Sequence, residues 1–422
     1  MEVTTSEGYA SGPEGAPLVA PNLAKAFQAS VEKLGDATAI ISGDDTVSWN
    51  ELHAQARACA GGFASLGVSK GDTIAIMLNN RSEFMPIDLG AVTLGAVPFS
   101  IYQTSSPEQI EHVCSDAGAK VAIVEAAFLE VFDKAKESLP ELEHIITLDG
   151  GGGTMTLEEL MAVDPDFDDA VADDVDLDDL LTLIYTSGTT GPPKGVQLTH
   201  RNLMSLVSSV EDMIPFPEDQ ENKVISWLPA AHIAERGAHY YLPVVMGISV
   251  TICPDPRKII EVLPQVRPTW FFAVPRIWEK LKAGLETMMS NLPEDKRGPA
   301  QQGLEAAIAK VRLEQNGEEV PEEIAAAAAA ADEAMFAMLR TSLGLDKAVA
   351  VNVGAAPTPL EVLEFFHAIG IPIGELWGCP RPAVSPRSTR PRRSSSAPLA
   401  RRRPGSRSSS PPTARCSSAA TQ

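Results

Sequence analysis

Residues 185–200 read YTSGTTGPPKGVQLTH, and the rest of the chain is organised around this stretch. It follows an apolar run, residues 180–184, with the length and character of a strand buried on both faces in a parallel sheet. The small residues and hydroxyls after that strand leave backbone N–H groups free to bind an anion. The sequence therefore predicts a phosphate-binding loop at the end of a central strand.

Each residue type in this loop has a physical reason to be there. Gly188, Gly191 and Gly195 permit positive φ and close backbone approach, so that successive N–H groups can converge on phosphate oxygens. Lys194 adds a mobile positive charge, and Thr199 stands where an N-cap would open the next helix. The spacing is not the P-loop pattern GxxxxGK[ST]. The alternative is a Gly/Ser/Thr-rich surface turn beside a solvated lysine.

Strand and helix patterns alternate along the chain on both sides of the loop. Buried strands are predicted at residues 73–77, 96–100, 120–125, 223–227, 249–252 and 270–273. Helical patterns at residues 49–66, 82–94 and 107–117 lie between the first of them. This alternation is typical of a doubly wound α/β layer.

The string at residues 185–200 resembles the phosphate-binding loop of the AMP-forming adenylate enzymes, which include acyl-CoA ligases, luciferases and peptide-synthetase adenylation domains. Residues 274–280, VPRIWEK, resemble a segment common to long-chain acyl-CoA ligases. The resemblance covers about residues 20–378. It implies a large N-terminal domain of doubly wound mixed sheets with helices on both faces. It also implies that ATP activates a fatty acid as an acyl-adenylate, which CoA converts to acyl-CoA.

The resemblance assigns roles to particular residues. His232, in the string WLPAAHIAERG at residues 227–237, would border the acyl site, although a lone histidine there is more often a structural cap. Glu235 and Arg236 are interpreted as local helix charges, and Trp278 as a packing residue or a wall of an acyl channel. The residues with catalytic roles are Thr186, Lys194 and His232. Those implied to bind ATP are Tyr185, Thr186, Ser187, Gly188, Thr189, Thr190, Gly191, Lys194, Gly354, Ala355, Ala356, Pro357, Trp377 and Gly378.

The turn at residues 354–357 resembles the adenine-side turn of the family, which usually carries two glycines. Ala355 departs from that pattern, and the added methyl group is expected to be a minor change. Trp377 stands at the position that resembles the adenine-stacking aromatic residue, and an indole suits such stacking.

The resemblance stops after Gly378. The family continues with a Ser or Thr that touches phosphate and a Glu that holds Mg²⁺, whereas this chain has Pro380 and Arg381 at those positions. Thr186 therefore remains only as a partial Mg²⁺ ligand. Residues 379–422 are mostly Arg, Ser, Pro and Ala, a composition that predicts disorder and suggests a frameshift. The family's ribose-binding aspartate, hinge and C-terminal catalytic-lysine domain have no counterpart in this text, so we expect a truncated form that is inactive or crippled.

The domain boundaries expected from these patterns are a flexible arm over residues 1–20 and an AMP-binding domain over residues 21–378. Within that domain, residues 293–343 read as a helical excursion of long-chain members, or as a surface hairpin of helices. The acid-rich residues 158–179 could form a metal cage, but their spacing favours a solvated linker.

The composition and net charge of the chain limit the kinds of ligand and partner that it is expected to bind. The chain has 422 residues and a formal net charge of −22, so nucleic acid is not expected as a main partner. Its five cysteines form no CxxC pair, and no apolar run reaches the ~20 residues of a spanning helix. A cytoplasmic protein is expected, with peripheral membrane contact left open and with fatty acid, ATP, Mg²⁺ and CoA as ligands implied by the resemblance. Alternatives are a short-chain acyl ligase, a peptide-synthetase adenylation domain, or a non-catalytic protein that binds through its basic tail.

Overall fold

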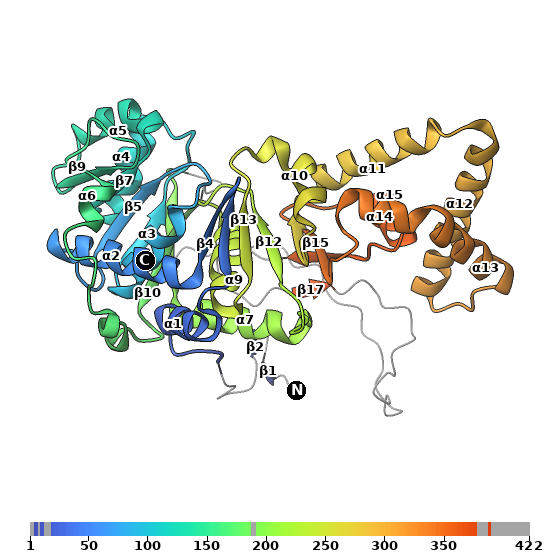
Figure 1. The fold of residues 1–422 in the computed structure, drawn as a ribbon, viewed down its shortest axis with the longest axis horizontal. Helices are drawn as coiled ribbons and strands as arrows, with labels where there is room; N and C mark the ends of the chain where they lie inside the picture. Colours follow the sequence, from blue (N-terminus) through green and yellow to red (C-terminus); the bar gives the residue numbers. More distant parts are fainter. Residues whose placement is uncertain (1–3, 7–8, 12–17, 187–190, 378–386, 390–422) are drawn as a thin grey trace.

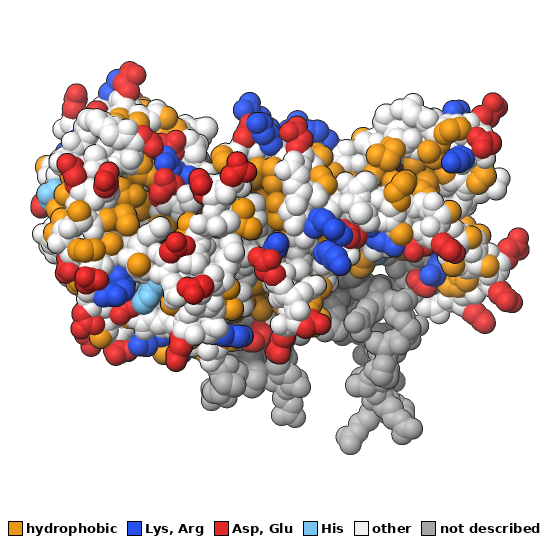
Figure 2. All heavy atoms as spheres, viewed as in Figure 1, with side chains coloured by type: hydrophobic (Ala, Val, Ile, Leu, Met, Phe, Trp, Pro, Cys, Tyr) orange, Lys and Arg blue, Asp and Glu red, His pale blue; other side chains and the backbone are white. Residues whose placement is uncertain are grey.

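The computed structural model describes residues 4–6, 9–11, 18–186, 191–377 and 387–389. Figure 1 shows three β-sheets with their helices, arranged along the long axis of the molecule, with the first sheet on the left and a helical lobe on the right. A small two-stranded sheet, β1 (Thr4–Ser6) with β2 (Tyr9–Ser11), lies near the N-terminus. Acidic side chains are scattered over the face drawn in Figure 2, and basic side chains gather at a few places on it, mainly near the middle of the view.

The first sheet has seven strands in the order β11-β10-β6-β5-β7-β8-β9 and is parallel except for the β10–β11 pair. All residues of its central strands β5, β6 and β7 are buried, as expected for a sheet covered on both faces. The strands are β5 (Thr73–Met77), β6 (Val97–Ser100), β7 (Val121–Val124), β8 (His144–Thr147), β9 (Met155–Thr156), β10 (Leu180–Thr186) and β11 (Lys194–Thr199). The helices near it are α2 (Trp49–Ser65), α3 (Phe84–Thr93), α4 (Pro107–Ala117), α5 (Leu129–Lys136) and α6 (Leu157–Met161).

The second sheet combines the start of the chain with its middle. Its order is β12-β13-β3-β4, in which β13 pairs in parallel with both β12 and β3. Phe27 of α1 shares one core with Val224 and Val250 of this sheet. The elements are α1 (Leu23–Leu34), β3 (Thr38–Ser42), β4 (Asp45–Ser48), α7 (His200–Met213), β12 (Lys223–Ser226), α9 (Leu242–Met246) and β13 (Ser249–Ile252).

The third sheet, β14-β15-β16-β17, supports the helical lobe. Trp278 is fully buried there, with its ring centroid 5.6 Å from that of Phe271 and 5.0 Å from that of Phe366, so Trp278 is a packing residue. The strands are β14 (Trp270–Ala273), β15 (Ala350–Gly354), β16 (Ile373–Trp377) and β17 (Arg387–Thr389). The helices are α10 (Ile259–Val266), α11 (Pro275–Ser290), α12 (Glu294–Asn316), α13 (Glu322–Ala331), η5 (Asp332–Phe336), α14 (Ala337–Leu343) and α15 (Leu360–Ala368).

The predicted α/β class is confirmed, and the predicted buried strands all appear within one or two residues of the expected bounds. The strand β11 was missed, because Lys194 and Gly195 are weak strand formers and the hairpin partner imposes the extended backbone. Of the tail, Arg387–Thr389 forms β17 and pairs antiparallel with β16. The rest of residues 379–422 lies outside the described residues, and the disorder, frameshift and domain boundaries stay predictions.

The acid-rich segment is bound along its length by basic and polar side chains. Asp169 lies 2.6 Å from His53 Nε2, Asp173 lies 2.6 Å from Lys25 Nζ, and Asp179 lies 2.6 Å from Lys70 Nζ. The described residues contain no group of three or more His, Cys, Asp or Glu arranged to hold a metal ion. The segment is therefore an ion-paired connection. In the part of the chain that the structure describes, no helix is both long and apolar enough to span a membrane.

Candidate active site

The predicted phosphate-binding loop joins the strands of a hairpin. In the antiparallel pairing of β10 with β11, Tyr185 lies opposite Gly195 and Thr186 opposite Lys194. Lys194 is exposed, and Gly191 has φ +88°. Ser187, Gly188, Thr189 and Thr190 lie outside the described residues. The structure thus brings Thr186 and Lys194 together at the carboxyl end of β10, where open α/β sheets bind ligands.

Helix α4 supports this hairpin through two polar contacts that the sequence did not reveal. His112 Nε2 lies 2.7 Å from the carbonyl oxygen of Pro193, and the hydroxyl of Tyr185 donates to Asp116 Oδ2 at 2.9 Å. A Cβ on Gly195 would lie 3.0 Å from the Tyr185 ring, so the glycine permits this packing. Burial, with Asp116 next to it, raises the pKa of Tyr185. Its hydroxyl is already engaged by Asp116, and its proposed contact with ATP stays a prediction. The sequence signal that could have revealed these contacts was the pair His112 and Asp116, two polar residues four apart on one face of α4.

A surface hollow of about 430 Å³ lies beside the same helix. It is lined by Glu108, Glu111, His112, Ser115 and Asp116. Three carboxylates would repel a triphosphate, so this hollow is not a nucleotide site.

His232 begins a short helix after the strand β12. It is the N-cap of α8 (Ile233–Glu235), and its Nδ1 accepts the N–H of Ala234 at 3.1 Å. The residue is exposed on one side, yet desolvation by the surrounding protein lowers its pKa. The ring is therefore neutral at neutral pH. The structure shows the capping role, and the border with the acyl site stays a prediction.

The interpretation of Glu235 and Arg236 as local helix charges is wrong, because both side chains are fully buried. Arg236 pairs with Asp88 of α3, and Glu235 accepts the N–H of Leu228 at 2.9 Å and lies 2.7 Å from His239 Nδ1. Both side chains lie in the protein interior, where a charge persists only with a partner. Asp88, an acid inside the apolar run of α3, indicated that a charge would be buried there but did not indicate its partner.

The two segments predicted to bind adenine lie side by side at the ends of parallel strands. Gly354 of β15 is opposite Leu376 of β16, and Trp377 is the next and last residue of β16. Gly378 lies outside the described residues. Ala355 has φ +72°, the left-handed region that costs a non-glycine residue about 1–2 kcal/mol. The expectation that its methyl group is a minor change is therefore wrong, because the backbone conformation itself favours glycine.

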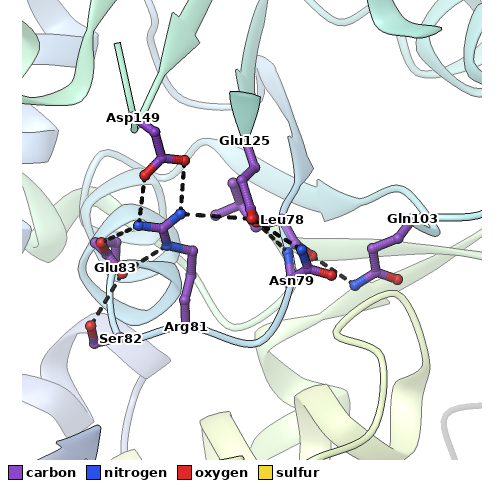
Figure 3. A network of polar contacts seen from close by, with 8 residues as sticks. All are labelled: Leu78, Asn79, Arg81, Ser82, Glu83, Gln103, Glu125 and Asp149. Atoms are coloured by element: carbon purple, nitrogen blue, oxygen red, sulfur yellow. Dashed lines mark hydrogen bonds and ion pairs between the residues drawn. The ribbon is translucent and has the colours of Figure 1, made fainter. Parts of the chain in front are cut away.

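Figure 3 shows a polar cluster at the carboxyl ends of β5, β7 and β8. Arg81 donates to Glu83 at 2.7 Å and to Asp149 at 3.0 Å. Asn79 donates to Glu125 through its backbone N–H at 2.8 Å. The next residue, Asn80, donates from Nδ2 to the carbonyl oxygen of Leu228 at 2.9 Å. The loop after β5 is thereby fixed, and it is tied to the turn that carries His232.

The described residues do not fit a magnesium site. Thr186 supplies one hydroxyl, the described residues hold no cluster of metal-ligating side chains, and the sequence has the cation Arg381 where the family places a carboxylate. Hard divalent cations need several oxygen ligands.

The sequence model described as "AMP-binding enzyme" matches residues 27–380. The chain therefore belongs to the AMP-binding enzyme family. It is 41% identical over 247 residues to the putative fatty-acid–CoA ligase fadD11 of Mycobacterium tuberculosis. The matched region covers 56% of this chain and 43% of that protein. The chain is 32% identical over 375 residues to the long-chain-fatty-acid–CoA ligase ACSBG2 of Xenopus laevis, covering 83% of this chain and 50% of that protein. The chain thus spans about half the length of these curated relatives.

Solved structures show the same fold. The inhibitor-bound N-terminal domain of FACL13 from Mycobacterium tuberculosis matches with a TM-score of 0.60 and 21% identity, over 85% of this chain and 76% of that one. O-succinylbenzoate coenzyme A synthetase from Bacillus subtilis, in complex with AMP, matches with a TM-score of 0.62 and 20% identity, over 88% and 77%.

Proposed function

We propose that this chain is the nucleotide-binding part of a long-chain fatty acid–CoA ligase. In the proposed reaction, a fatty carboxylate oxygen attacks the α-phosphorus of ATP and pyrophosphate leaves. The thiol of CoA then attacks the acyl carbon of the adenylate, AMP leaves, and the thiol proton goes to solvent. The support is the family membership together with relatives described as fatty-acid–CoA ligases. Fatty acids partition into membranes, so the enzyme would work in the cytoplasm with peripheral membrane contact.

The observation that carries the proposal is the β10–β11 hairpin, which sets Thr186 opposite the exposed Lys194 at the ligand-binding edge of a parallel sheet. Adenylation needs little proton transfer, because the barrier comes mainly from bringing two anions together. Catalysis is then positioning and charge compensation. Lys194 would neutralise charge on the phosphates, and Thr186 would donate its hydroxyl to them.

The remaining residues would frame the other parts of the ligand. The turn at Gly354 and Ala355, next to the end of β16, would take the adenine. His232 is neutral, so it would border the carboxylate without an ion pair. Because Arg381 replaces an acid, we further propose that this chain binds ATP weakly and turns over negligibly.

A metal-independent ligand tests the proposal most directly. A non-hydrolysable palmitoyl-adenylate analogue with a sulfamate in place of the phosphate should bind the full chain, and titration calorimetry measures its Kd. Lys194→Ala should weaken binding about tenfold, which corresponds to about 1.4 kcal/mol. Lys134→Ala is the matched control, since Lys134 is an exposed lysine on α5 that pairs with Glu130. Failure of the full chain to bind the analogue would overturn the proposed function.

Two further measurements refine the result. Analogues with acetyl or amino-acyl groups distinguish the short-chain and peptide-synthetase alternatives, because each would then bind more tightly than the palmitoyl compound. Palmitate-driven exchange of pyrophosphate into ATP, at a rate typical of a complete ligase, would contradict the proposal of negligible turnover.

A further inference from the structure

One carbonyl oxygen connects the two parts of the candidate site. The oxygen of Pro98, in β6, accepts the hydroxyl of Thr182 at 2.7 Å and Nη2 of Arg236 at 3.2 Å. Thr182 lies in β10, four residues before Thr186, and Arg236 lies one helical turn after His232. Thr182 and Arg236 are both fully buried. The strand of the phosphate loop and the turn of His232 therefore meet on the same acceptor.

The guanidinium of Arg236 is held from several directions. It donates to Ser100 Oγ at 2.7 Å and to the hydroxyl of Tyr241 at 2.9 Å, and it forms an ion pair with Asp88. It also lies 5.4 Å from the ring centroid of Phe84. Because the planar guanidinium has partners on each side, it can adopt only one orientation. It therefore fixes the positions of its partners relative to one another, in addition to compensating the charge of Asp88.

Arg236 is in turn fixed to His232. Its backbone N–H donates to the carbonyl oxygen of His232 at 3.2 Å. Arg236 also begins η3 (Arg236–Tyr241), a π-helical segment. Such widened turns occur frequently at functional sites. The Arg236 side chain thus links the His232 turn, which follows β12 of the second sheet, to β6 of the first sheet.

A purely structural role would not need these charges. Burying an ion pair is costly, and apolar residues of similar size often stabilise a core as well or better. Oδ2 of Asp88 has no partner among the described residues, and a void of about 10 Å³ lined partly by Asp88, Phe84 and Tyr240 adjoins it. A void of that size admits one water at most. The buried charge of Arg236 is better explained by its hydrogen bonds, which fix the orientation of the guanidinium relative to β6.

We propose that Arg236 is a positioning residue that sets the His232 turn relative to the strand β10 through the shared carbonyl of Pro98. The inference rests on the proposed function for the meaning of these two segments. A ligand that spans both segments needs their relative placement, because a small displacement of reacting groups is costly. AMP, which engages the nucleotide side alone, does not need it.

The test removes each half of the link separately. Thr182→Val deletes one hydroxyl from a buried site and leaves Arg236 in place. Arg236→Lys keeps the charge but loses the fork, and Arg236→Met loses both. Thr73→Val is the matched control: Thr73 lies in β5 of the same sheet, and its hydroxyl donates at 2.9 Å to the carbonyl oxygen of Ala117 in α4, with no contact to Arg236 among the described hydrogen bonds. Circular dichroism first establishes which variants remain folded.

The readout compares two ligands. Thr182→Val and Arg236→Lys should weaken the palmitoyl-adenylate analogue about tenfold and change the Kd of AMP less than twofold, with Thr73→Val changing neither. Equal losses for both ligands, or no loss for either, would overturn the inference while leaving the proposed function standing. If the unmodified chain binds neither ligand, the proposed function fails. Hydrogen exchange then decides the link, because Thr182→Val must still speed exchange of amides in residues 228–236, and unchanged rates would refute it.

Discussion

Gly354 and Leu376 lie opposite each other in the parallel strands β15 and β16, and they leave no room for a side chain on Gly354. A Cβ there would lie 2.8 Å from the carbonyl oxygen of Leu376 and 3.1 Å from the Phe272 ring. The close contact brings the turn that begins at Gly354 against the end of β16. The backbone carbonyl cannot move away without breaking the strand pairing.

Gly354→Ala should therefore destabilise the protein by about 1–3 kcal/mol, the usual cost of overpacking. Urea denaturation followed by circular dichroism measures the change. Gly284→Ala is the control, since a Cβ at Gly284 of α11 meets no atom within 4 Å. That variant should be neutral or more stable by up to about 1 kcal/mol, because alanine is the better helix former. Equal effects of the two changes would contradict the account of the contact.

Ala355 and Ala356 provide a matched pair in one exposed turn. Ala355→Gly should raise stability by up to about 1 kcal/mol, because it relieves a left-handed alanine at φ +72°. Ala356 does not have positive φ, so Ala356→Gly should lower stability by about 0.5–1 kcal/mol. Thermal unfolding of both variants checks the sign. A lower Tm for Ala355→Gly would show that the methyl group makes a contact worth more than the strain.

Stability should fall as the solution is acidified below pH 6.5, in part because of His200. Desolvation lowers its pKa from 6.5 to about 4, and its Nδ1 accepts the N–H of Leu23 at 3.1 Å. The folded state therefore binds fewer protons than the unfolded state between these two values. The contribution is fully present above pH 6.5 and decreases toward pH 4 by about 3 kcal/mol in total.

His200→Asn isolates this contribution, because asparagine can still accept the Leu23 N–H but does not titrate. The difference in unfolding free energy between the chain and the variant should vary with pH between 6.5 and 4 and be constant above 6.5. A difference independent of pH across that window would show that His200 is protonated as easily in the folded state as in the unfolded state.

The described cysteines should be unreactive in the native protein. Burial raises the pKa of Cys59 and Cys114 to about 12 and that of Cys253 to about 11, so few thiolates form at pH 8. In a Cys379→Ser, Cys416→Ser background, a thiol reagent should label fewer than about one in ten of these thiols within an hour at pH 8, and all of them in urea. Rapid native labelling of Cys59 would require local opening around α2.

The sequence predicted the architecture well, because buried strands and helices repeat with clear periods. It predicted Thr199 as an N-cap, and the structure shows a complete capping box with Asn202. It failed where partners lie far apart in the chain. No local pattern connects Asp88 with Arg236, or Thr182 with Pro98, since such contacts depend on how two sheets are placed. The φ of Ala355 was equally hidden, because a turn's conformation depends on the strands that it joins.

The pairing of β3 with β13 has a consequence for synthesis on the ribosome. All strands of the seven-stranded sheet come before residue 200, whereas β3 meets its parallel partner only when residues 249–252 have emerged. In a nascent chain, β3 with its residue Ile40 therefore stays without its partner β13 while more than 200 residues are translated. Pairing between strands that are far apart in the sequence is slow, and it leaves the apolar surface of β3 exposed until β13 is made. We therefore expect holdase chaperones to bind the β3–β4 hairpin during translation.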